Sequence, residues 1–309
     1  MKTIFIVNPC AGQGNKAKLL IDKIRKENCD LYITKTVGDA TRYVKEYIKK
    51  YGPARFIACG GDGTFNEVLN GVENCADAHI GLIPIGTGND FCRNFDSSFD
   101  NVSKQLDGEV VKCDAIRYTI QNDGGEISGY CANMLNIGFD CNVADMTANM
   151  KKKPFISGSM AYLAATLTNL IGKKGANLKI EIDNQVKHCG KLLLTTIANG
   201  SYCGGGVKSN PLASVRDGKI NINIVKDVSR LRFLRLLPSY INGTLLNVKN
   251  IDQVVFNTSC QKITVTPLDG KMRLCIDGEI IDAGKTTFEI CPGVFNFIVP
   301  DKSQVASKI

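Results

Sequence analysis

The sequence has little histidine, and its cysteines are not spaced as metal ligands. Only His79 and His188 could complete a zinc cluster, and none of the 13 cysteines among the 309 residues forms a Cys-x-x-Cys pair. A structural zinc site is therefore not expected. The odd number of cysteines, together with the lack of an N-terminal signal peptide, favours reduced thiols in a cytosol, most of them filling the core.

Long apolar runs are also missing. No run approaches the roughly 18 residues that a membrane-spanning helix requires, so the longest amphipathic segments can at most lie on a membrane surface. The apolar content of 44% and the charged content of 22% are those of an ordinary soluble protein, which excludes disorder and fibrous repeats. The net charge of +8 suits phosphate, nucleic acid or an anionic membrane as a partner. Because the basic clusters lack the interleaved aromatic residues of single-strand binders, nucleic acid is not expected.

The first 95 residues repeat one pattern three times: an apolar strand, a glycine loop and a helix. In each repeat a short apolar run is followed by small residues and then by apolar positions at helical spacing. This alternation predicts an open α/β sheet, mostly parallel, whose ligand binds at the carboxyl ends of the strands. The expected strands are residues 3–7, 31–33, 55–59 and 80–84, and the expected helices are 16–26, 39–50 with Asp39 as its cap, and 65–71.

From about residue 115 the pattern changes to short segments rich in β-branched residues, separated by Gly, Asn or Asp. This pattern predicts an antiparallel sheet or sandwich, with helices at 158–171 and 229–241. The expected fold is an α/β nucleotide-binding domain with a mostly parallel sheet (1–117, completed by about 299–309), followed by a β-rich, sandwich-like domain (118–298). The expected strands of the second domain are residues 115–121, 178–182, 191–198, 219–225, 261–266, 272–276 and 286–290.

The segment 59–70, CGGDGTFNEVLN, directly follows an expected buried strand. Its glycines let the backbone approach a phosphate closely, and amides at the start of the next helix point toward an anion. Asp62 could hold a water or Mg²⁺ against the phosphates, and Thr64 offers a hydroxyl. The alternative is an ordinary glycine turn in which Asp62 or Thr64 caps the helix.

Two further loops combine small and polar residues at the ends of strands, NPCAG at 8–12 and PIGTGND at 84–90. Asn8 and Pro9 could simply end a strand, and a Thr or Asp in the later loop could simply cap a helix. Parallel strands end at one edge of a sheet, so the three loops should meet there. Their convergence favours a phosphate-binding site.

In this order and spacing, NPCAG, GGDGTFNEVLNG and PIGTGNDFCR resemble the diacylglycerol kinase catalytic domain family, most closely its soluble bacterial lipid kinases. The likeness covers nearly the whole chain. Further segments of this sequence resemble landmarks of the family's second domain. They are NIGFD at 136–140, GGG at 204–206 with Pro211, Asp217-Gly218, and Asp277-Gly278-Glu279. The resemblance implies ATP as phosphoryl donor, bound in a cleft between an α/β domain and a β-sandwich.

The expected nucleotide-binding residues come from the three loops and from the resemblance. Thr34 rests on the resemblance alone. Because Cys10, Cys59 and Cys92 lie in or beside these loops, ATP binding is expected to be sensitive to oxidation. The full set is Asn8, Pro9, Cys10, Ala11, Gly12, Thr34, Gly60, Gly61, Asp62, Gly63, Thr64, Phe65, Asn66, Glu67, Gly86, Thr87, Asn89 and Asp90.

Carboxylates carry the expected catalytic chemistry. An alcohol that attacks the γ-phosphate must lose its proton, so a positioned carboxylate is the natural acceptor. The resemblance places this acceptor at Glu279, with Asp277 as the neighbouring candidate for orienting the hydroxyl; Asp62 completes the expected catalytic set. By spacing alone, an Asp-Gly hairpin turn is the better interpretation, and such a turn would separate the two side chains.

Asp217-Gly218 also has a hairpin turn as its simpler interpretation. The resemblance implies a structural Mg²⁺ there, held by the Asp217 side chain with oxygens of Ser214 and Lys219. Lys219 could contribute only its carbonyl, since an ammonium group does not bind a cation. Asp114 matches a family carboxylate linked to this region and is expected to order water rather than to bind ATP.

Arginines and apolar residues alternate along residues 229–237, SRLRFLRLL. Such a segment can lie on an anionic bilayer, with roughly 1 kcal/mol gained per cation near the surface. The alternative is a packed helix with solvated arginines. Residues 151–153, three lysines, are a second candidate contact, for which a solvated loop is the simpler interpretation.

The resulting hypothesis is an ATP- and Mg²⁺-dependent kinase that phosphorylates the hydroxyl of diacylglycerol or a related lipid. It would work in the cytoplasm at the inner face of the membrane, with anionic lipid as a partner. The sequence leaves open whether two copies of the chain form a homodimer. The alternatives are an NAD kinase-like enzyme, which shares GGDGT, and a nucleotide-gated membrane-binding module without catalysis. The acceptor lipid stays open, because apolar pockets discriminate weakly between acyl chains.

Overall fold

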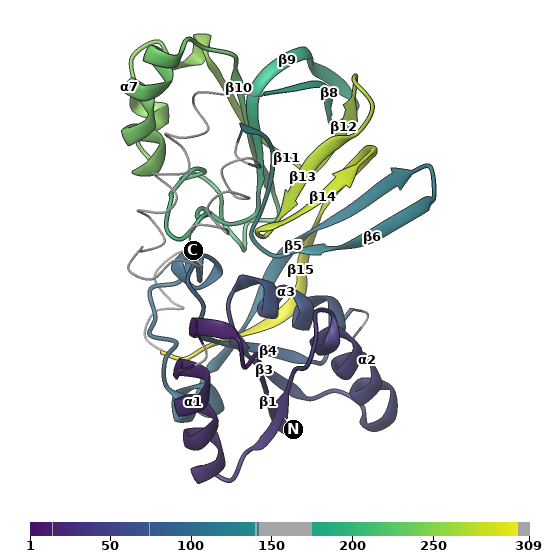
Figure 1. Cartoon of the computed structure of the whole chain (residues 1–309), viewed down its shortest axis with the longest axis vertical. Helices are drawn as coiled ribbons and strands as arrows, with labels where there is room; N and C mark the ends of the chain where they lie inside the picture. Colours follow the sequence, from purple (N-terminus) through teal and green to yellow (C-terminus); the bar gives the residue numbers. More distant parts are fainter. Residues whose placement is uncertain (14, 74, 140, 142–174, 302–309) are drawn as a thin grey trace. The chain divides into compact units, whose positions relative to one another are not determined.

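The computed structural model describes residues 1–13, 15–73, 75–139, 141 and 175–301 (Figure 1). The chain forms two compact units, Met1–Asp114 with Gly293–Ile309, and Ala115–Pro292. It passes from one unit to the other within two long strands, β5 (Glu109–Asn122) and β15 (Lys285–Val299). The sequence-based division lies a few residues further along the chain at both crossings.

The first unit contains the mostly parallel sheet that the sequence predicts. Strands β4, β3, β1 and β2 lie in this order and are all parallel, and the end of β15 pairs in parallel with β4. Strands β1, β3 and β4 are almost entirely buried, as expected for parallel strands with helices on both faces, whereas the edge strand β2 is partly exposed. Their bounds are Thr3–Val7 (β1), Asp30–Ile33 (β2), Arg55–Gly60 (β3) and His79–Pro84 (β4).

The helices of this unit pack on opposite faces of the sheet. Leu20 and Ile24 of α1 cluster with Phe5 of β1, whereas Tyr47 of α2 packs edge-on at 5.6 Å against Phe56 of β3. Helix α3 packs beside α2. The helices are α1 (Asn15–Lys26), α2 (Asp39–Tyr51), α3 (Asp62–Gly71) and α4 (Val102–Asp107), with short 3-10 turns at Ala11–Gln13 (η1) and Phe91–Asn94 (η2).

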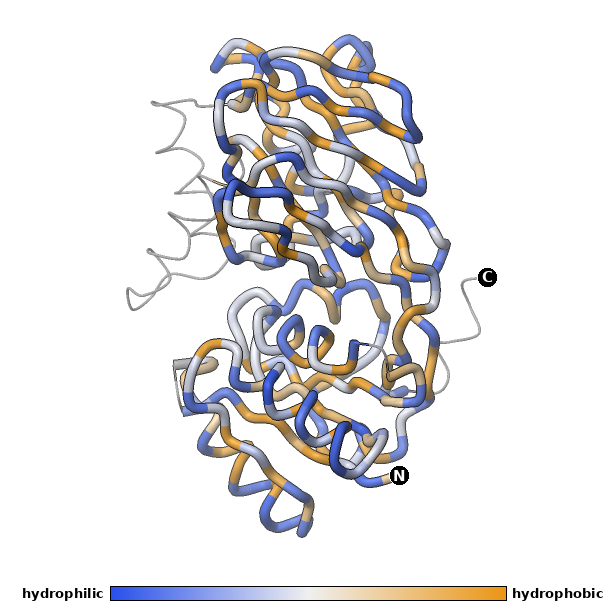
Figure 2. The backbone as a smooth tube through the Cα atoms, turned by 90° about the vertical axis from the view of Figure 1, so that its right-hand side faces the viewer, coloured by the Kyte–Doolittle hydropathy of each residue, from blue (hydrophilic) through white to orange (hydrophobic). Residues whose placement is uncertain are grey.

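The second unit is antiparallel. Strand β9 pairs with β7, β8 and β10, and the path continues through β8 to β12 and β15 on one side and through β7 to β13 and β14 on the other. Its strands are β6 (Gly125–Cys131), β7 (Met134–Gly138), β8 (Ala176–Ile182), β9 (Gln185–Ala198), β10 (Ile220–Lys226), β11 (Val255–Cys260), β12 (Lys262–Pro267), β13 (Met272–Ile276) and β14 (Glu279–Ala283). Hydrophobic and hydrophilic residues alternate along many of these strands (Figure 2).

Two apolar layers stabilise this unit. One is formed by side chains of the strands alone and includes Ile116, Leu135 and Phe288, all fully buried. The other lies between the sheet and helix α7 (Arg230–Ile241), the helix expected at 229–241. The 3-10 turns Leu245–Asn247 (η3) and Ile251–Gln253 (η4) follow it. The helix expected at 158–171 and the lysines at 151–153 lie outside the described residues.

Eight of the 13 cysteines are buried, in line with the expectation that most of them fill the core. Among the described residues no helix is long and apolar enough to cross a membrane. In the same part of the chain no group of three His, Cys, Asp or Glu side chains could hold a metal ion.

Candidate functional site

Three loops leave the carboxyl edge of the parallel sheet. The first loop (8–12) follows β1, the second (60–64) follows β3, and the third (85–90) follows β4. The amides of Ile85 and Gly86 both donate to the carbonyl of Gly60, at 3.0 and 3.1 Å. The second and third loops are thereby joined at their bases.

Glycine is required where these two loops meet. A Cβ on Gly86 would lie 2.5 Å from the Cα of Gly61, and a Cβ on Gly60 would lie 2.2 Å from Oγ1 of Thr64. Both distances are too short for any real side chain. The GG and GTG sequences thus allow two backbones to touch, which is the close approach that the motif predicts.

The first loop is joined to the other two. Asn8 Nδ2 donates to Thr64 Oγ1 at 3.3 Å, and Asn8 Oδ1 accepts the amide of Cys10 at 3.0 Å. Gly12 has φ +61°, and a Cβ there would lie 2.4 Å from the carbonyl oxygen of Ile85. The structure therefore brings the three loops together, as the spacing of the motifs predicts.

Asp62 does not cap its own helix. The cap residue of α3 is Gly61, which has no side chain with which to bond there. Instead, Asp62 Oδ1 accepts the amides of Asp90 and Phe91 at 2.7 and 3.3 Å. The first turn of α3 therefore receives no capping bond from Gly61, and Asp62 is its acidic residue. The simple capping interpretation of Asp62 is wrong, and its expected role toward Mg²⁺ stays a prediction.

The third loop also contains an unused acceptor. Asn89 has φ +53°, and its Nδ2 donates to the carbonyl of Gly86 at 2.9 Å. Its Oδ1 is buried and accepts no hydrogen bond from the described residues. Thr87, two residues earlier, is exposed. The loop therefore contains one buried acceptor and one exposed hydroxyl besides its amides.

An aromatic cluster packs at the base of the second and third loops. The rings of Phe65, in α3, and Phe91, in η2, stack at 4.5 Å, and Phe297 of β15 meets both edge-on at 5.8 and 5.1 Å. Phe65 and Phe91 are buried, so Phe65 acts as support, and its expected nucleotide contact stays a prediction. Asn66 faces along α3, accepting from Asn70 at 3.1 Å.

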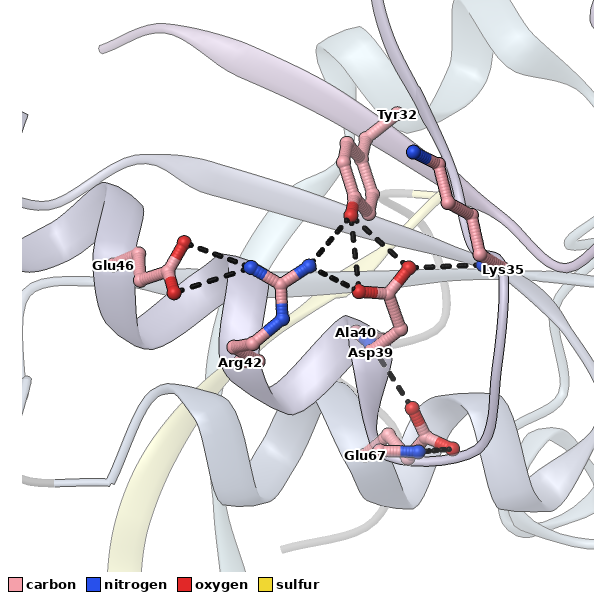
Figure 3. Close-up of polar contacts among 8 residues, drawn as sticks. Tyr32, Lys35, Asp39, Ala40, Arg42, Glu46 and Glu67 are labelled. Atoms are coloured by element: carbon pink, nitrogen blue, oxygen red, sulfur yellow. Dashed lines mark hydrogen bonds and ion pairs between the residues drawn. The ribbon is translucent and has the colours of Figure 1, made fainter.

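Glu67 holds the start of helix α2. Its carboxylate accepts the amides of Gly38 at 2.9 Å and Ala40 at 3.1 Å (Figure 3). Asp39 was the expected cap of α2, and that expectation is wrong, since the cap is Gly38 without a side-chain bond. The capping acceptors come from α3, 27 and 29 residues further along the chain. The expected contact of Glu67 with the nucleotide stays a prediction.

Asp39 fixes the loop before α2 instead. It is 5% exposed and accepts the amide of Lys35 at 2.9 Å, the hydroxyl of Tyr32 at 3.0 Å and an N–H of Arg42 (Figure 3). The Lys35 amide, followed by Arg42 and Tyr32, lowers the pKa of Asp39 despite its burial. Just before this loop, Thr34 is buried, and its amide and hydroxyl donate to the carbonyl of Val7 at 3.0 and 3.4 Å.

In the second unit, Asp277 and Gly278 form the two-residue turn of the β13–β14 hairpin. Their φ values are +45° and +98°, and Ile276 pairs with Glu279 across the turn. Asp277 Oδ1 accepts the amide of Met134 at 2.9 Å, and its Oδ2 accepts the amide of Ala132 at 3.1 Å. The hairpin interpretation is correct. Asp277 orients the turn, whereas Glu279 is exposed at the start of β14.

The expected metal residues lie in an exposed turn of the second unit. Asp217 Oδ1 accepts the amide of Lys219 at 3.1 Å, and Gly218 has φ +67°. The donors that Ser214, Asp217 and Lys219 can offer are a hydroxyl, a carboxylate and a carbonyl, which are all oxygens and fit Mg²⁺ by their chemistry. Asp114 is buried, and its Oδ1 accepts the amide of Gly293 at 2.7 Å, which ties β5 to β15.

Comparisons with known proteins agree with this arrangement. Residues 2–118 match the diacylglycerol kinase catalytic domain, and residues 133–299 match the YegS C-terminal NAD kinase beta sandwich-like domain. The chain is 28% identical over 282 residues to the "Diacylglycerol kinase" of Bacillus subtilis (strain 168), covering 89% of this chain and 88% of that protein. It is also 28% identical over 310 residues to the "Probable lipid kinase YegS-like" of Pseudomonas fluorescens, covering 98% and 96%.

The solved structures agree on the fold. A crystal structure of a diacylglycerol kinase from Bacillus anthracis str. Sterne has a TM-score of 0.69 and 24% sequence identity, and the match covers 98% of each chain. The two domain families therefore match successive parts of this chain and together account for almost all of it. The chain belongs to the diacylglycerol kinase family of lipid kinases, with a diacylglycerol kinase catalytic domain followed by a YegS-type C-terminal domain.

Proposed function

We propose that this protein transfers the γ-phosphate of ATP to the hydroxyl of diacylglycerol or a related lipid, giving a phosphatidic-acid-type product. The observation that carries the proposal is the meeting of three glycine loops at the carboxyl edge of the parallel sheet, beside the start of helix α3. Amides in such a place bind phosphate. In this proposal the enzyme works in the cytoplasm and visits its substrate at the inner face of the membrane.

Glu279 is the proposed proton acceptor. The lipid hydroxyl oxygen forms a bond to the γ-phosphorus while the bond from that phosphorus to the bridging oxygen of ADP breaks, and the hydroxyl proton passes to the Glu279 carboxylate. Asp277 acts through the backbone, because its two oxygens hold the amides of Ala132 and Met134. It is therefore a positioning residue for the turn that carries Glu279.

Divalent cations complete the proposal. Ser214, Asp217 and Lys219 would hold a structural Mg²⁺ through oxygen donors. Mg²⁺ that accompanies ATP neutralises charge on the phosphates when bound. Asp62 is the carboxylate nearest to the second-loop glycines in sequence.

An apolar pocket in the second unit supports a lipid acceptor. It lies between the sheet and α7, and only Tyr240 among its lining residues has a polar side-chain atom. Leu193, Val225 and Val255 line it from strands β9, β10 and β11, and Phe233 and Leu237 line it from α7. The cavity is small, about 30 Å³, and would have to widen to admit an acyl chain. Its apolar lining suits such a chain, whereas a soluble nucleotide acceptor would require polar partners.

The test is phosphate transfer from γ-labelled ATP in the presence of a total lipid extract. We expect label in an organic-extractable product, and we expect Glu279→Gln to abolish transfer while ATP still binds. Asp282→Asn, on the same strand and also exposed, is the matched control and should retain activity. Full activity of Glu279→Gln, or label in NAD and not in lipid, would contradict the proposal.

A further inference from the structure

The outer face of helix α7 combines exposed leucines with arginines. Leu231 and Leu234 are 60% and 39% exposed, and Arg232 and Arg235 beside them are also exposed. The inner face is formed by other residues, because Phe233 is buried in the layer against the sheet. Exposed and buried residues recur along α7 with the period of an α-helix. Leu231 and Leu234 therefore belong to its outer face and are not core residues exposed by fraying. The helix is well formed at its start, where Ser229 accepts the amide of Arg232 at 3.3 Å.

Arg232 and Arg235 on this face have no acidic partner in the part of the chain that the structure describes. Helix α7 carries three arginines and no acidic residue. Helix α2 shows the usual alternative, since its Arg42 pairs with both Asp39 and Glu46. The charges of Arg232 and Arg235 are therefore available to an anionic partner.

We infer that the outer face of α7 docks on a membrane that contains anionic lipids, with Leu231 and Leu234 among the acyl chains and Arg232 and Arg235 on the phosphates. Leucines flanked by long cationic side chains fit the boundary between headgroups and acyl chains, because the alkyl stem of arginine stays in the apolar region while its guanidinium reaches the headgroup. The inference deepens the proposed function and rests on it for its purpose, since a lipid kinase must reach a substrate held in a bilayer.

The chemistry of the face favours a membrane over other anionic partners. It presents no aromatic side chain, whereas protein interfaces are anchored mainly by aromatic residues together with arginine, and single-stranded nucleic acid stacks on aromatic rings. The only described polar groups among the leucines are guanidinium groups, which bind phosphate without reading a sequence.

The pocket described above lies on the other side of the same helix. Phe233 and Leu237 face the pocket, while Leu234 and Arg235 face outward. One helix, about 10 Å across, thus separates the proposed membrane surface from the apolar pocket. A membrane bound at this face would bring a lipid within one helix diameter of the pocket.

The chain contains no tryptophan, so Leu234→Trp would introduce a single fluorescent reporter into the full-length protein. We expect its emission to shift to shorter wavelength with vesicles of phosphatidylglycerol and phosphatidylcholine, and to be quenched when the acyl chains are brominated. Vesicles of phosphatidylcholine alone should give little change. Unshifted emission on anionic vesicles would overturn the inference. A shift that depends on protein concentration without vesicles would indicate self-association at this face and would also overturn it.

Co-sedimentation of the otherwise unmodified chain gives a second measurement. Arg232→Gln with Arg235→Gln should weaken binding to anionic vesicles by about 30-fold, from roughly 1 kcal/mol for each cation. Lys187→Gln with Lys191→Gln, on exposed positions of β9 in the same unit, is the control with the same charge change, and an equal loss there would overturn the inference. Because ATP is absent, vesicle binding succeeds or fails independently of phosphate transfer, and transfer to a short-chain lipid in detergent tests the proposed function separately.

Discussion

The carboxylate of Asp62 accepts the backbone amide of Asp90 at 2.7 Å and so joins the start of α3 to the loop that follows β4. A second amide, that of Phe91, donates to the same oxygen at 3.3 Å. The two loops that approach each other through Gly61 and Gly86 are thus also joined by a charged acceptor. Asp62 therefore shapes the third loop, which belongs to the proposed phosphate site, whatever it does toward a cation.

Replacing Asp62 separates these two roles. Asp62→Ala leaves two amides without their acceptor, and we expect a loss of about 1–3 kcal/mol in the free energy of unfolding together with weaker ATP binding. Asp62→Asn retains an oxygen acceptor and should keep most of the stability. Urea unfolding and ATP titration at several Mg²⁺ concentrations measure both. If Asp62→Ala unfolds like the wild type, the carboxylate does not hold the third loop.

The sequence predicts strands β1 to β4 and helices α1 to α3 of the first unit because each is defined locally. It does not predict α4, and the helix expected after the third loop is only the short 3-10 turn η2. An apolar run such as residues 55–59 must be a strand buried on both faces, and the glycines that follow permit close contact of backbones. The meeting of the three loops also follows, because parallel strands end at a common edge. These features need no knowledge of distant contacts.

The partners of the carboxylates could not be predicted, because they lie far away in the sequence. Asp277 binds amides at Ala132 and Met134, 145 and 143 residues earlier. Local sequence suggests only that an Asp before a Gly forms a turn. For the same reason the capping of α2 was assigned to Asp39, the nearest carboxylate, although Glu67 reaches it from α3.

The contact between Gly61 and Gly86 gives a steric prediction. Gly86→Ala places a methyl group 2.5 Å from the Cα of Gly61, so the two loops must separate. We expect ATP affinity to fall at least tenfold, a change of about 1.4 kcal/mol. Gly124→Ala is the control, because a Cβ there meets no atom within 4 Å. Equal ATP affinity in the two variants would show that the contact is not needed for binding.

The three cysteines near the loops differ in reactivity. Burial raises the pKa of the Cys59 and Cys92 thiols well above their ordinary value, and a neutral thiol reacts poorly with peroxide. Cys10 is exposed. We expect mild peroxide to weaken ATP binding in the wild type and in Cys189→Ser, which lacks another exposed thiol, but not in Cys10→Ser. Persistent sensitivity of Cys10→Ser would assign the effect to another cysteine.

Asp301 gives the first unit a dependence on acid. It accepts hydrogen bonds from Lys104 Nζ at 2.8 Å and from the Ser98 amide at 3.0 Å, and these lower its pKa to about 2, with Lys104 as the largest cause. A folded-state pKa below the unfolded value of about 3.9 means that the stabilisation is complete above about pH 4 and is lost as the pH falls toward 2.

Urea unfolding at pH 5 and pH 2.5 tests this assignment. Asp301→Asn should be less stable than the wild type at pH 5, and the difference should shrink at pH 2.5. The Asp100→Asn variant, with an exposed acid nearby in the sequence, controls for the general loss of negative charge. A difference between wild type and Asp301→Asn that is the same at both pH values would contradict the assigned pKa.

Glu67 is expected to act on ATP through α2. Its two oxygens hold the amides of Gly38 and Ala40 at the end of the segment that begins at Thr34 (Figure 3). Glu67→Ala removes both acceptors, so this segment should loosen, and the KM for ATP should rise more than kcat falls. Glu67→Gln retains one acceptor oxygen and should recover part of the KM. Glu46→Gln, an exposed acid on α2 itself, is the control. If Glu67→Gln lowers kcat as much as Glu67→Ala at saturating ATP, the carboxylate takes part in the reaction directly rather than through the position of α2.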